Sequence, residues 1–222
     1  DSIMILTLDT VHKKIKLTSI MRDSYVNIEG YGMDKINHAY AYGKAQLSLK
    51  TINQNYGLDV DKYALVNFNS LSKIVDILGG VELEITDEEV SHINGIDSAG
   101  VYTLNGAQAL AYSRIRYASG GDYVRTERQR NVIDALFNKA VTMPATAYLS
   151  ILNEVLPYIQ TNMSATEIIS LATNTLGLIT NPTIEQARLP LDGYSEGSTI
   201  NGIYYLTFDR EYTKEKFMNY IF

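Results

Sequence analysis

The fold class is decided by the stretch 64–85, ALVNFNSLSKIVDILGGVELEI. Its first five residues predict a short strand, and the next ten predict a helix that opens at an asparagine–serine cap. The glycine pair Gly79-Gly80 suits the left-handed end of this helix. The last five residues alternate apolar and acidic side chains, as a strand with one buried face does. A strand, a helix and a strand in direct succession indicate an α/β protein.

Strands and helices alternate along the rest of the chain as well. Residues 2–8 and 14–20 predict two strands, and the second should expose one face because lysine and threonine alternate with apolar residues. The remaining pattern predicts helices at 36–43, 45–55, 105–112, 122–141, 144–160, 164–176 and 213–221, and strands at 184–190 and 202–208. No repeat or linker interrupts the sequence, so we expect one α/β domain over residues 1–222 with a mixed β-sheet.

The composition excludes several classes of protein. The 222 residues carry a net charge of -6 and a pI near 5.1, which argues against general nucleic-acid binding. The chain has no cysteine, so disulfides, thiolate metal sites and a cysteine nucleophile are excluded. Its three histidines are too scattered to suggest a zinc site, and no apolar run is long enough to cross a membrane.

The first predicted strand begins at residue 2, almost at the start of the chain. Natural chains rarely begin inside a buried strand without a lead-in. We therefore expect a further segment upstream in the natural protein, which could carry a secretion signal or a membrane anchor.

Arginine is concentrated in one part of an otherwise acidic protein. Five of the eight arginines lie between residues 114 and 130. A guanidinium group presents a planar fork of donors that matches two oxygens of a phosphate or a carboxylate. Such a cluster either forms ion pairs with carboxylates such as Asp23, Asp122 and Glu127 or binds an anionic ligand, and by itself it leaves both interpretations open.

Several short motifs follow one another in a fixed order. They are Asp1-Ser2, Met21-Arg22-Asp23-Ser24, 35–40 (KINHAY), 66–68 (VNF), 76–81 (DILGGV), 104–116 (LNGAQALAYSRIR) and 122–129 (DYVRTERQ). Together they closely resemble the LytR-CpsA-Psr family of bacterial cell-envelope proteins. The resemblance covers residues 1 to about 140 and is specific, because several spaced motifs agree.

The resemblance implies a phosphotransferase on the outer face of the cytoplasmic membrane, mostly in Gram-positive bacteria. Such proteins move a glycopolymer, such as wall teichoic acid or capsule, from a polyprenyl pyrophosphate carrier to peptidoglycan. The family fold is an α/β sandwich with a central sheet, flanking helices and a long hydrophobic groove for the lipid. One N-terminal helix usually anchors the protein to the membrane, and activity depends on magnesium or manganese.

The family's functional positions carry over to this sequence residue by residue. The metal carboxylate falls on Asp1, and a second metal carboxylate of the family lies upstream of residue 1. The family's proline–arginine–aspartate motif falls on Met21-Arg22-Asp23, where methionine replaces a proline that would only stiffen the loop. The positions implied to bind phosphate or lipid are Arg22, Arg114, Arg116, Arg125, Arg128, Gln129, Asn67 and Phe68, and those implied in catalysis are Arg22, Arg114, Arg116, Asp122 and Arg125.

Pyrophosphate chemistry explains why such residues would be needed. Cleavage spreads negative charge over several oxygens, so arginines and a metal ion held by Asp1 would stabilise the transition state. Among arginines, Asp122 is better suited to orient one of them than to act as a base, because such neighbours lower the pKa of a carboxyl. Gln129 falls on the same helix face as Arg125, four residues later. Arg130, at the end of the cluster, is expected to be solvated.

Two other functions remain open at this point. The same arginines could bind polyprenyl pyrophosphate without catalysis, as a carrier or scaffold would. The family's older label of transcriptional attenuator would require a basic nucleic-acid surface, which the acidic pI disfavours. Hydrolysis of the lipid pyrophosphate by water is a conceivable side reaction of the same site.

Overall fold

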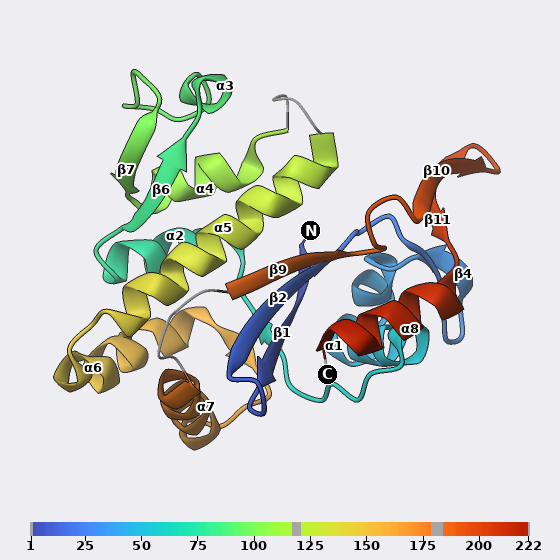
Figure 1. Ribbon diagram of the computed structural model, residues 1–222, viewed down its shortest axis with the longest axis horizontal. Coiled ribbons are helices and arrows are strands. Elements are labelled where there is room, and N and C mark those ends of the chain that lie inside the picture. Colours follow the sequence, from blue (N-terminus) through green and yellow to red (C-terminus); the bar gives the residue numbers. More distant parts are fainter. Residues whose placement is uncertain (1, 117–120, 179–183, 222) are drawn as a thin grey trace. The chain divides into compact units, whose positions relative to one another are not determined.

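The computed structural model describes residues 2–116, 121–178 and 184–221. Within these ranges the chain forms eight α-helices, one short 3-10 helix and eleven strands (Figure 1). The predicted mixed α/β class is therefore confirmed. The described strands form one three-stranded sheet and four two-stranded sheets.

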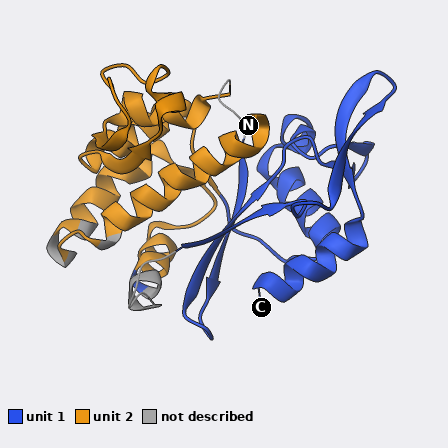
Figure 2. Cartoon of the chain, turned by 45° about the horizontal axis from the view of Figure 1, so that its top comes forward, with its two compact units in different colours: residues 1–63, 173–222 blue, residues 64–172 orange. Residues whose placement is uncertain are grey.

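The chain divides into two compact units (Figure 2). Unit 1 consists of residues 1–63 and 173–222, and unit 2 consists of residues 64–172. Each unit has its own cluster of buried apolar side chains. The single domain over residues 1–222 stays a prediction.

The largest sheet belongs to unit 1 and has the strand order β1-β2-β9. Strand β1 (Ile3–Asp9) pairs antiparallel with β2 (Lys14–Ile20), and β2 pairs parallel with β9 (Ile184–Leu189). The backbone N–H of Met21 then donates to the carbonyl of Leu189 at 2.8 Å, which extends the ladder by one residue. This sheet is mixed, and its middle strand leads directly into the loop that carries Arg22.

The prediction that β2 exposes one face is wrong. Six of its seven residues are buried, including Lys16 at 5% exposure. The Nζ of Lys16 donates to the carbonyl of Tyr220 at 2.7 Å and lies 3.4 Å from Oδ2 of Asp9. An ammonium group can be buried here because its N–H groups donate hydrogen bonds to carbonyl oxygens near the end of the last helix and to a carboxylate.

The core of unit 1 is built around α1 (His38–Tyr56). This helix packs against the hairpin of β3 (Tyr25–Ile28) and β4 (Gly32–Lys35) and against α8 (Arg210–Ile221). Among the most buried side chains of this core are Val26, Ile28, Tyr56, Leu189 and Phe217.

Helix α1 is made of two helical pieces, in agreement with the two helices predicted for this segment. Gly43 and Lys44 leave the helical conformation, and Lys44 takes a φ of 55°. The second piece ends at Gly57, whose φ of 71° is the left-handed conformation that glycine adopts without strain.

A second hairpin of unit 1 consists of β10 (Ser195–Ile200) and β11 (Ile203–Phe208). It is tied to the loop before β3, because the backbone N–H of Leu206 donates to the carbonyl of Asp23 at 2.9 Å. The sequence predicted β11 but missed β3, β4 and β10. These three strands are short or polar, and cross-strand pairing rather than an apolar pattern defines them.

Unit 2 begins with β5 (Ala64–Leu65), which is shorter than the predicted strand because α2 (Phe68–Ile77) begins early. Oδ1 of Asn67 accepts the backbone N–H of Ser70 at 2.9 Å and so caps this helix. The asparagine at 67, and not the predicted one at 69, is the helix cap.

The rest of unit 2 continues the alternation of strands and helices. Its further elements are β6 (Val81–Ile85), α3 (Asp87–Val90), β7 (Gly100–Leu104), α4 (Gly106–Arg114), α5 (Gly121–Val141), α6 (Ala145–Val155), the 3-10 helix Leu156–Tyr158 and β8 (Gln160–Thr161). They are followed by α7 (Ala165–Leu178). Strands β6 and β7 form an antiparallel hairpin, and β5 pairs with β8. The sequence missed β7 and β8.

Helices α2 and α4 pack closely at Gly106. A Cβ atom there would lie 2.0 Å from the carbonyl oxygen of Ser72, so only glycine fits. The backbone N–H of Gly106 also donates to Oδ1 of Asp76 at 2.8 Å. Because the first residue of α4 meets the middle and end of α2, the last residue of α4 reaches the start of α2.

None of the helices in the described ranges is both long and apolar enough to cross a membrane.

Candidate functional site

The first turns of α5 bring two candidate residues together. Nη1 of Arg125 lies 3.0 Å from Oδ1 of Asp122, and Nη2 donates to Oδ2 at 3.2 Å. This two-point pairing fixes the plane of the guanidinium group, whose side chain is 3% exposed. Asp122 is thus placed where it can orient Arg125, and its role in catalysis stays a prediction.

The next arginine of α5 has a different partner. Nε of Arg128 donates to Oε1 of Glu89 at 2.6 Å, and both side chains are buried. Oε2 of Glu89 accepts the backbone N–H of Thr86 at 2.9 Å as part of a capping box at α3. Glu89 therefore joins α5 to the turn after β6. Within the described ranges, Nη1 of Arg128 and Oε1 of Gln129 are buried without a hydrogen-bond partner.

Arg114 and Phe68 come together at the ends of α4 and α2. The guanidinium carbon of Arg114 lies 4.8 Å from the centre of the Phe68 ring, within the range of a cation–π contact. Both side chains are exposed, and the cap at Asn67 fixes the start of α2 beneath them. Arg116 is also exposed and lies just beyond the end of α4.

Arg22 belongs to unit 1, whereas the other described candidates belong to unit 2. Nε of Arg22 lies 3.4 Å from Oδ2 of Asp23, and Nζ of Lys35 donates to Oδ1 of the same carboxylate at 2.7 Å. Asp23 is thus held mainly by Lys35, and the side chain of Arg22 keeps 27% exposure.

Two further predictions concern the ends of the candidate set. The expectation that Arg130 is solvated is wrong, because Arg130 is 7% exposed in the interior of unit 2. Asp1 lies outside the described residues, so its role stays a prediction.

The sequence reading missed Glu89 as a member of this region. Glu89 meets Arg128 across 39 positions in the chain, so no local pattern shows the pair. One local signal was available: threonine at 86 and glutamate at 89 have the spacing of a capping box. In such a box the glutamate side chain accepts the backbone N–H of the cap residue.

A cavity of about 520 Å³ lies in unit 2 beside the Glu89–Arg128 pair. Its carboxylates are Glu82, Glu84, Glu89, Glu127 and Asp134. Burial raises the pKa of Asp134, and a hydrogen bond from Asn138 opposes this only in part. Arg114, Arg116 and Arg125 do not line this cavity, and a phosphate would be repelled by its acidic wall.

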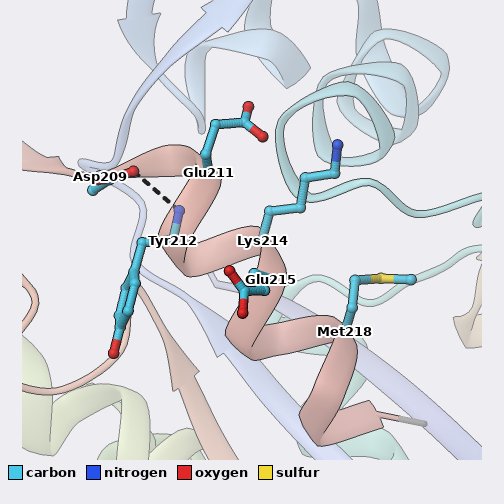
Figure 3. Close-up of a pocket in the computed structure, with 6 residues that line it drawn as sticks. All are labelled: Asp209, Glu211, Tyr212, Lys214, Glu215 and Met218. Atoms are coloured by element: carbon cyan, nitrogen blue, oxygen red, sulfur yellow. Dashed lines mark hydrogen bonds between the residues drawn. The ribbon is translucent and has the colours of Figure 1, made fainter.

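A second depression, of about 410 Å³, lies along α8 in unit 1 (Figure 3). Its lining residues are Asp209, Glu211, Tyr212, Lys214, Glu215 and Met218. Figure 3 shows that these side chains point in different directions from the helix. Oδ1 of Asp209 accepts the backbone N–H of Tyr212 at 3.0 Å, which is a helix cap. None of the candidate residues contributes to this depression.

Carboxylate oxygens are the side-chain ligands that magnesium prefers in proteins. A divalent cation of this type needs several oxygen ligands around one point. No group of three or more aspartate, glutamate or histidine side chains within the described ranges could hold a metal ion. The described side chains therefore form no ready-made cage for a metal ion, and Asp1, the predicted ligand, lies outside them.

These observations define a mixed α/β protein in which the arginines of α4 and α5 have different surroundings: Arg114 is exposed beside Phe68, whereas Arg125 and Arg128 are buried in ion pairs. The chain belongs to the LytR-CpsA-Psr family, because the model of the LytR_cpsA_psr family matches residues 1–219.

Curated relatives agree with this assignment. The chain is 33% identical over 214 residues to "Polyisoprenyl-teichoic acid--peptidoglycan teichoic acid transferase TagU" of Halalkalibacterium halodurans, a match that covers 95% of this chain and 68% of the relative. It is 37% identical over 155 residues to "Regulatory protein MsrR" of Staphylococcus aureus, covering 66% of this chain. That match spans about half of MsrR, 47% of its length.

Solved structures share the fold. The crystal structure of Bacillus subtilis TagU superposes with a TM-score of 0.75 at 30% identity, covering 100% of this chain and 91% of that chain. A structure described as TagT bound to LI-WTA superposes with a TM-score of 0.82 at 28% identity, covering 100% of this chain and 83% of that chain.

Proposed function

We propose that this protein is a phosphotransferase that moves an anionic glycopolymer from a polyprenyl pyrophosphate carrier to peptidoglycan. The glycopolymer would be of the wall teichoic acid or capsule type. The observation that carries the proposal is the 33% identity, over 95% of this chain, to a relative named as a teichoic acid transferase. The arginine group on α4 and α5 supports it chemically.

Arg114, Arg116 and Arg125 of unit 2 would bind the pyrophosphate. Arg114 and Arg116 are exposed and can reach phosphate oxygens. Arg125 is preset by its two contacts with Asp122, so little reorganisation is needed when negative charge develops. Arg22 remains a candidate from the family motif, with its side chain partly exposed.

The proposed reaction replaces one phosphorus–oxygen bond by another. A hydroxyl group of the acceptor sugar attacks the phosphorus that carries the glycopolymer, and the bond from this phosphorus to the bridging oxygen breaks. Polyprenyl phosphate leaves with that oxygen, and the hydroxyl proton passes to solvent or to a base. The arginines neutralise the phosphate oxygens of the transition state.

The lipid part of the substrate needs an apolar surface near the phosphates. Phe68 is 51% exposed beside Arg114, and Val66 is 39% exposed just before α2. Exposed apolar side chains next to a cationic group suit a substrate with a charged head and an apolar tail. We propose that they belong to a lipid groove of an α/β sandwich with a central sheet, as the family resemblance implies.

Magnesium or manganese is proposed as the cofactor, with Asp1 as its ligand. When bound, the cation would neutralise charge on the pyrophosphate. The proposed location is the outer face of the cytoplasmic membrane of a Gram-positive bacterium.

The decisive experiment is a transfer assay with lipid-linked glycopolymer, peptidoglycan and magnesium. We expect the wild type to attach polymer and Arg116→Ala to lose about 10²- to 10³-fold in rate, the usual cost of one lost electrostatic donor. Arg210→Ala is the matched control, since Arg210 is exposed and lies in α8 outside the candidate set. Equal rates for both variants would show that the cluster is structural.

The same reagents distinguish the transferase from a protein that only binds the lipid carrier. A carrier or scaffold would bind polyprenyl pyrophosphate, lose that binding in Arg116→Ala, and form no attached product. Hydrolysis without transfer, measured as released phosphate, would instead indicate a pyrophosphatase.

A regulatory function is the second candidate, and the name of the relative MsrR favours it. Direct DNA binding requires a basic face, whereas this chain carries a net charge of -6. A gel-shift assay with a salt titration tests it, and specific binding to DNA would favour this candidate over the transferase.

A further inference from the structure

Three exposed tyrosines of unit 1 lie on neighbouring segments: Tyr31 and Tyr42 beside the carboxylate of Asp34, and Tyr204 beside Lys35. Tyr31 is 56% exposed, Tyr42 is 42% exposed and Tyr204 is 51% exposed. Tyr31 is in the turn between β3 and β4, Tyr42 is in the first piece of α1, and Tyr204 is in β11. Together with Asp34 we call them the tyrosine ledge.

The rings of Tyr31 and Tyr42 form a stacked pair. Their centroids are 4.3 Å apart and their planes differ by 13°. The hydroxyl of Tyr42 donates to Oδ2 of Asp34 at 2.7 Å, and Nδ1 of His38 lies 2.8 Å from the same oxygen. The hydrogen bond to Asp34 raises the pKa of Tyr42, so its phenol stays protonated.

Tyr204 is held on the other hairpin. Its ring lies against Gly197 of the paired strand, where an added Cβ would come 2.7 Å from a ring carbon. Nζ of Lys35 lies 6.0 Å from the centre of this ring and 5.7 Å from that of Tyr205. Asp34 and Lys35 are adjacent residues of β4, so the stacked pair and Tyr204 both have a partner on this strand.

Tyr31 and Tyr42 are thus held by their stacking and by the hydrogen bond to Asp34, and the ring of Tyr204 lies against Gly197. Exposed aromatic side chains that are ordered in the free protein lose little conformational entropy on binding. The stacked pair is exposed on the outside of the protein, where it can meet a partner.

The charge of the ledge selects among partners. Segment 22–35 carries two basic and three acidic side chains, a net charge of -1. A surface that binds anionic lipid needs an excess of lysine and arginine instead. A glycan fits better, because sugar rings offer apolar C–H faces to phenol rings and hydroxyl groups to phenol oxygens and a carboxylate.

We propose that the tyrosine ledge binds a strand of neutral N-acetylated hexoses. The sugar rings would lie on the outer faces of Tyr31, Tyr42 and Tyr204, and sugar hydroxyls would donate to Asp34. This last step rests on the proposed transferase function: there, the strand is the glycan of the peptidoglycan acceptor.

The test is isothermal titration calorimetry with a hexamer of N-acetylglucosamine. We expect the wild type to bind and Tyr31→Ala and Tyr42→Ala each to weaken binding by about tenfold or more, as central aromatic anchors do. Tyr42→Phe keeps the ring and should bind more tightly than Tyr42→Ala. Tyr158→Ala is the matched control, because Tyr158 is 37% exposed and lies in unit 2. Circular dichroism melting verifies that each variant is folded.

Two results would overturn the proposal. One is a wild type that does not bind the hexamer, or ledge variants that bind it as the wild type does. The other is binding of vesicles of phosphatidylglycerol and phosphatidylcholine that is lost in Tyr31→Ala, which would assign the ledge to a membrane surface.

The transferase proposal is tested separately from this one. Arg116→Ala is expected to leave hexamer binding unchanged, since Arg116 is not one of the ledge residues. Hexamer binding without any polymer transfer would reject the transferase and leave the ledge as a glycan site. Transfer without hexamer binding would do the reverse.

Discussion

Met21 stands where the family motif has proline, and its backbone N–H has a specific partner. This N–H donates to the carbonyl of Leu189 at 2.8 Å, and the side chain is buried. Proline has no backbone N–H and could not donate this hydrogen bond, so the methionine has a structural role in this chain. The residue joins β9 to the loop that carries Arg22.

Met21→Pro is therefore expected to destabilise the protein by about 1–3 kcal/mol, because a buried carbonyl loses its donor. Met21→Leu keeps the N–H and an apolar side chain of similar size, so its cost should be below about 1.5 kcal/mol. Urea unfolding followed by circular dichroism measures both. Equal stability of the two variants would show that the hydrogen bond contributes nothing.

Asp9 gives the stability a dependence on acid. The backbone hydrogen bond from His12 lowers its pKa most, the His12 and Lys16 side chains add to this, and burial opposes it. Because the folded pKa lies below the unfolded value of about 3.9, the stabilisation is present above that pH and is lost as the pH falls below it.

In Asp9→Asn, the free energy of unfolding should decrease less than in the wild type as the pH falls from about 5 to about 2. Urea unfolding at a series of pH values checks this. Asp59→Asn is the control, since Asp59 is exposed, and it should keep the wild-type slope. A wild-type slope in Asp9→Asn would contradict the assignment.

At the scale of elements, the close packing of α2 and α4 places Phe68 beside Arg114. It depends on Gly106, where a Cβ would lie 2.0 Å from the carbonyl oxygen of Ser72. Gly106→Ala should cost about 1–3 kcal/mol, as overpacking usually does, although alanine otherwise favours helices.

The matched control for Gly106→Ala is Ala107→Ser, at an exposed position of the same turn. It should change the stability by no more than about 0.5 kcal/mol. Thermal or urea unfolding compares the variants. A Gly106→Ala variant as stable as the wild type would mean that the two helices can separate without cost.

The ion pair of Glu89 and Arg128 fixes α5 against the turn after β6. Removing one partner leaves the other charge buried, so Glu89→Ala should destabilise by about 3–5 kcal/mol. The double variant Glu89→Leu with Arg128→Met should recover part of this loss. A double-mutant cycle of Glu89→Leu, Arg128→Met and the double variant, followed by urea unfolding, measures the coupling, and additive effects would show that the pair is not coupled.

At the scale of the whole molecule, we expect the metal to be needed for transfer but not for binding of the lipid pyrophosphate. Asp1→Ala is expected to abolish transfer but to leave binding of polyprenyl pyrophosphate largely intact, because the arginines remain. Chelation of divalent cations should have the same effect on the wild type, with activity restored by added magnesium. A fully active Asp1→Ala variant would remove Asp1 as a metal ligand.

The local sequence predicted those elements whose pattern is strong. The helices 69–78 and 122–141 and the strand 14–20 were found within one residue of α2, α5 and β2. Short polar strands such as β4 and β10 were missed, because only their partners across the hairpin define them. The burial of both faces of β2 was not predicted, because the hydrogen-bond acceptor that allows Lys16 to be buried lies near the other end of the chain.

The sequence by itself determined the mixed α/β class, the family and the order of its motifs, because these depend on residue types at fixed spacing. Only the tertiary structure decided which partner each arginine has. Asp122 lies three residues from Arg125 and could be guessed, whereas Glu89 lies 39 residues from Arg128. The tyrosine ledge likewise joins three separate segments of unit 1. Such contacts are set by packing between distant segments, which no local pattern records.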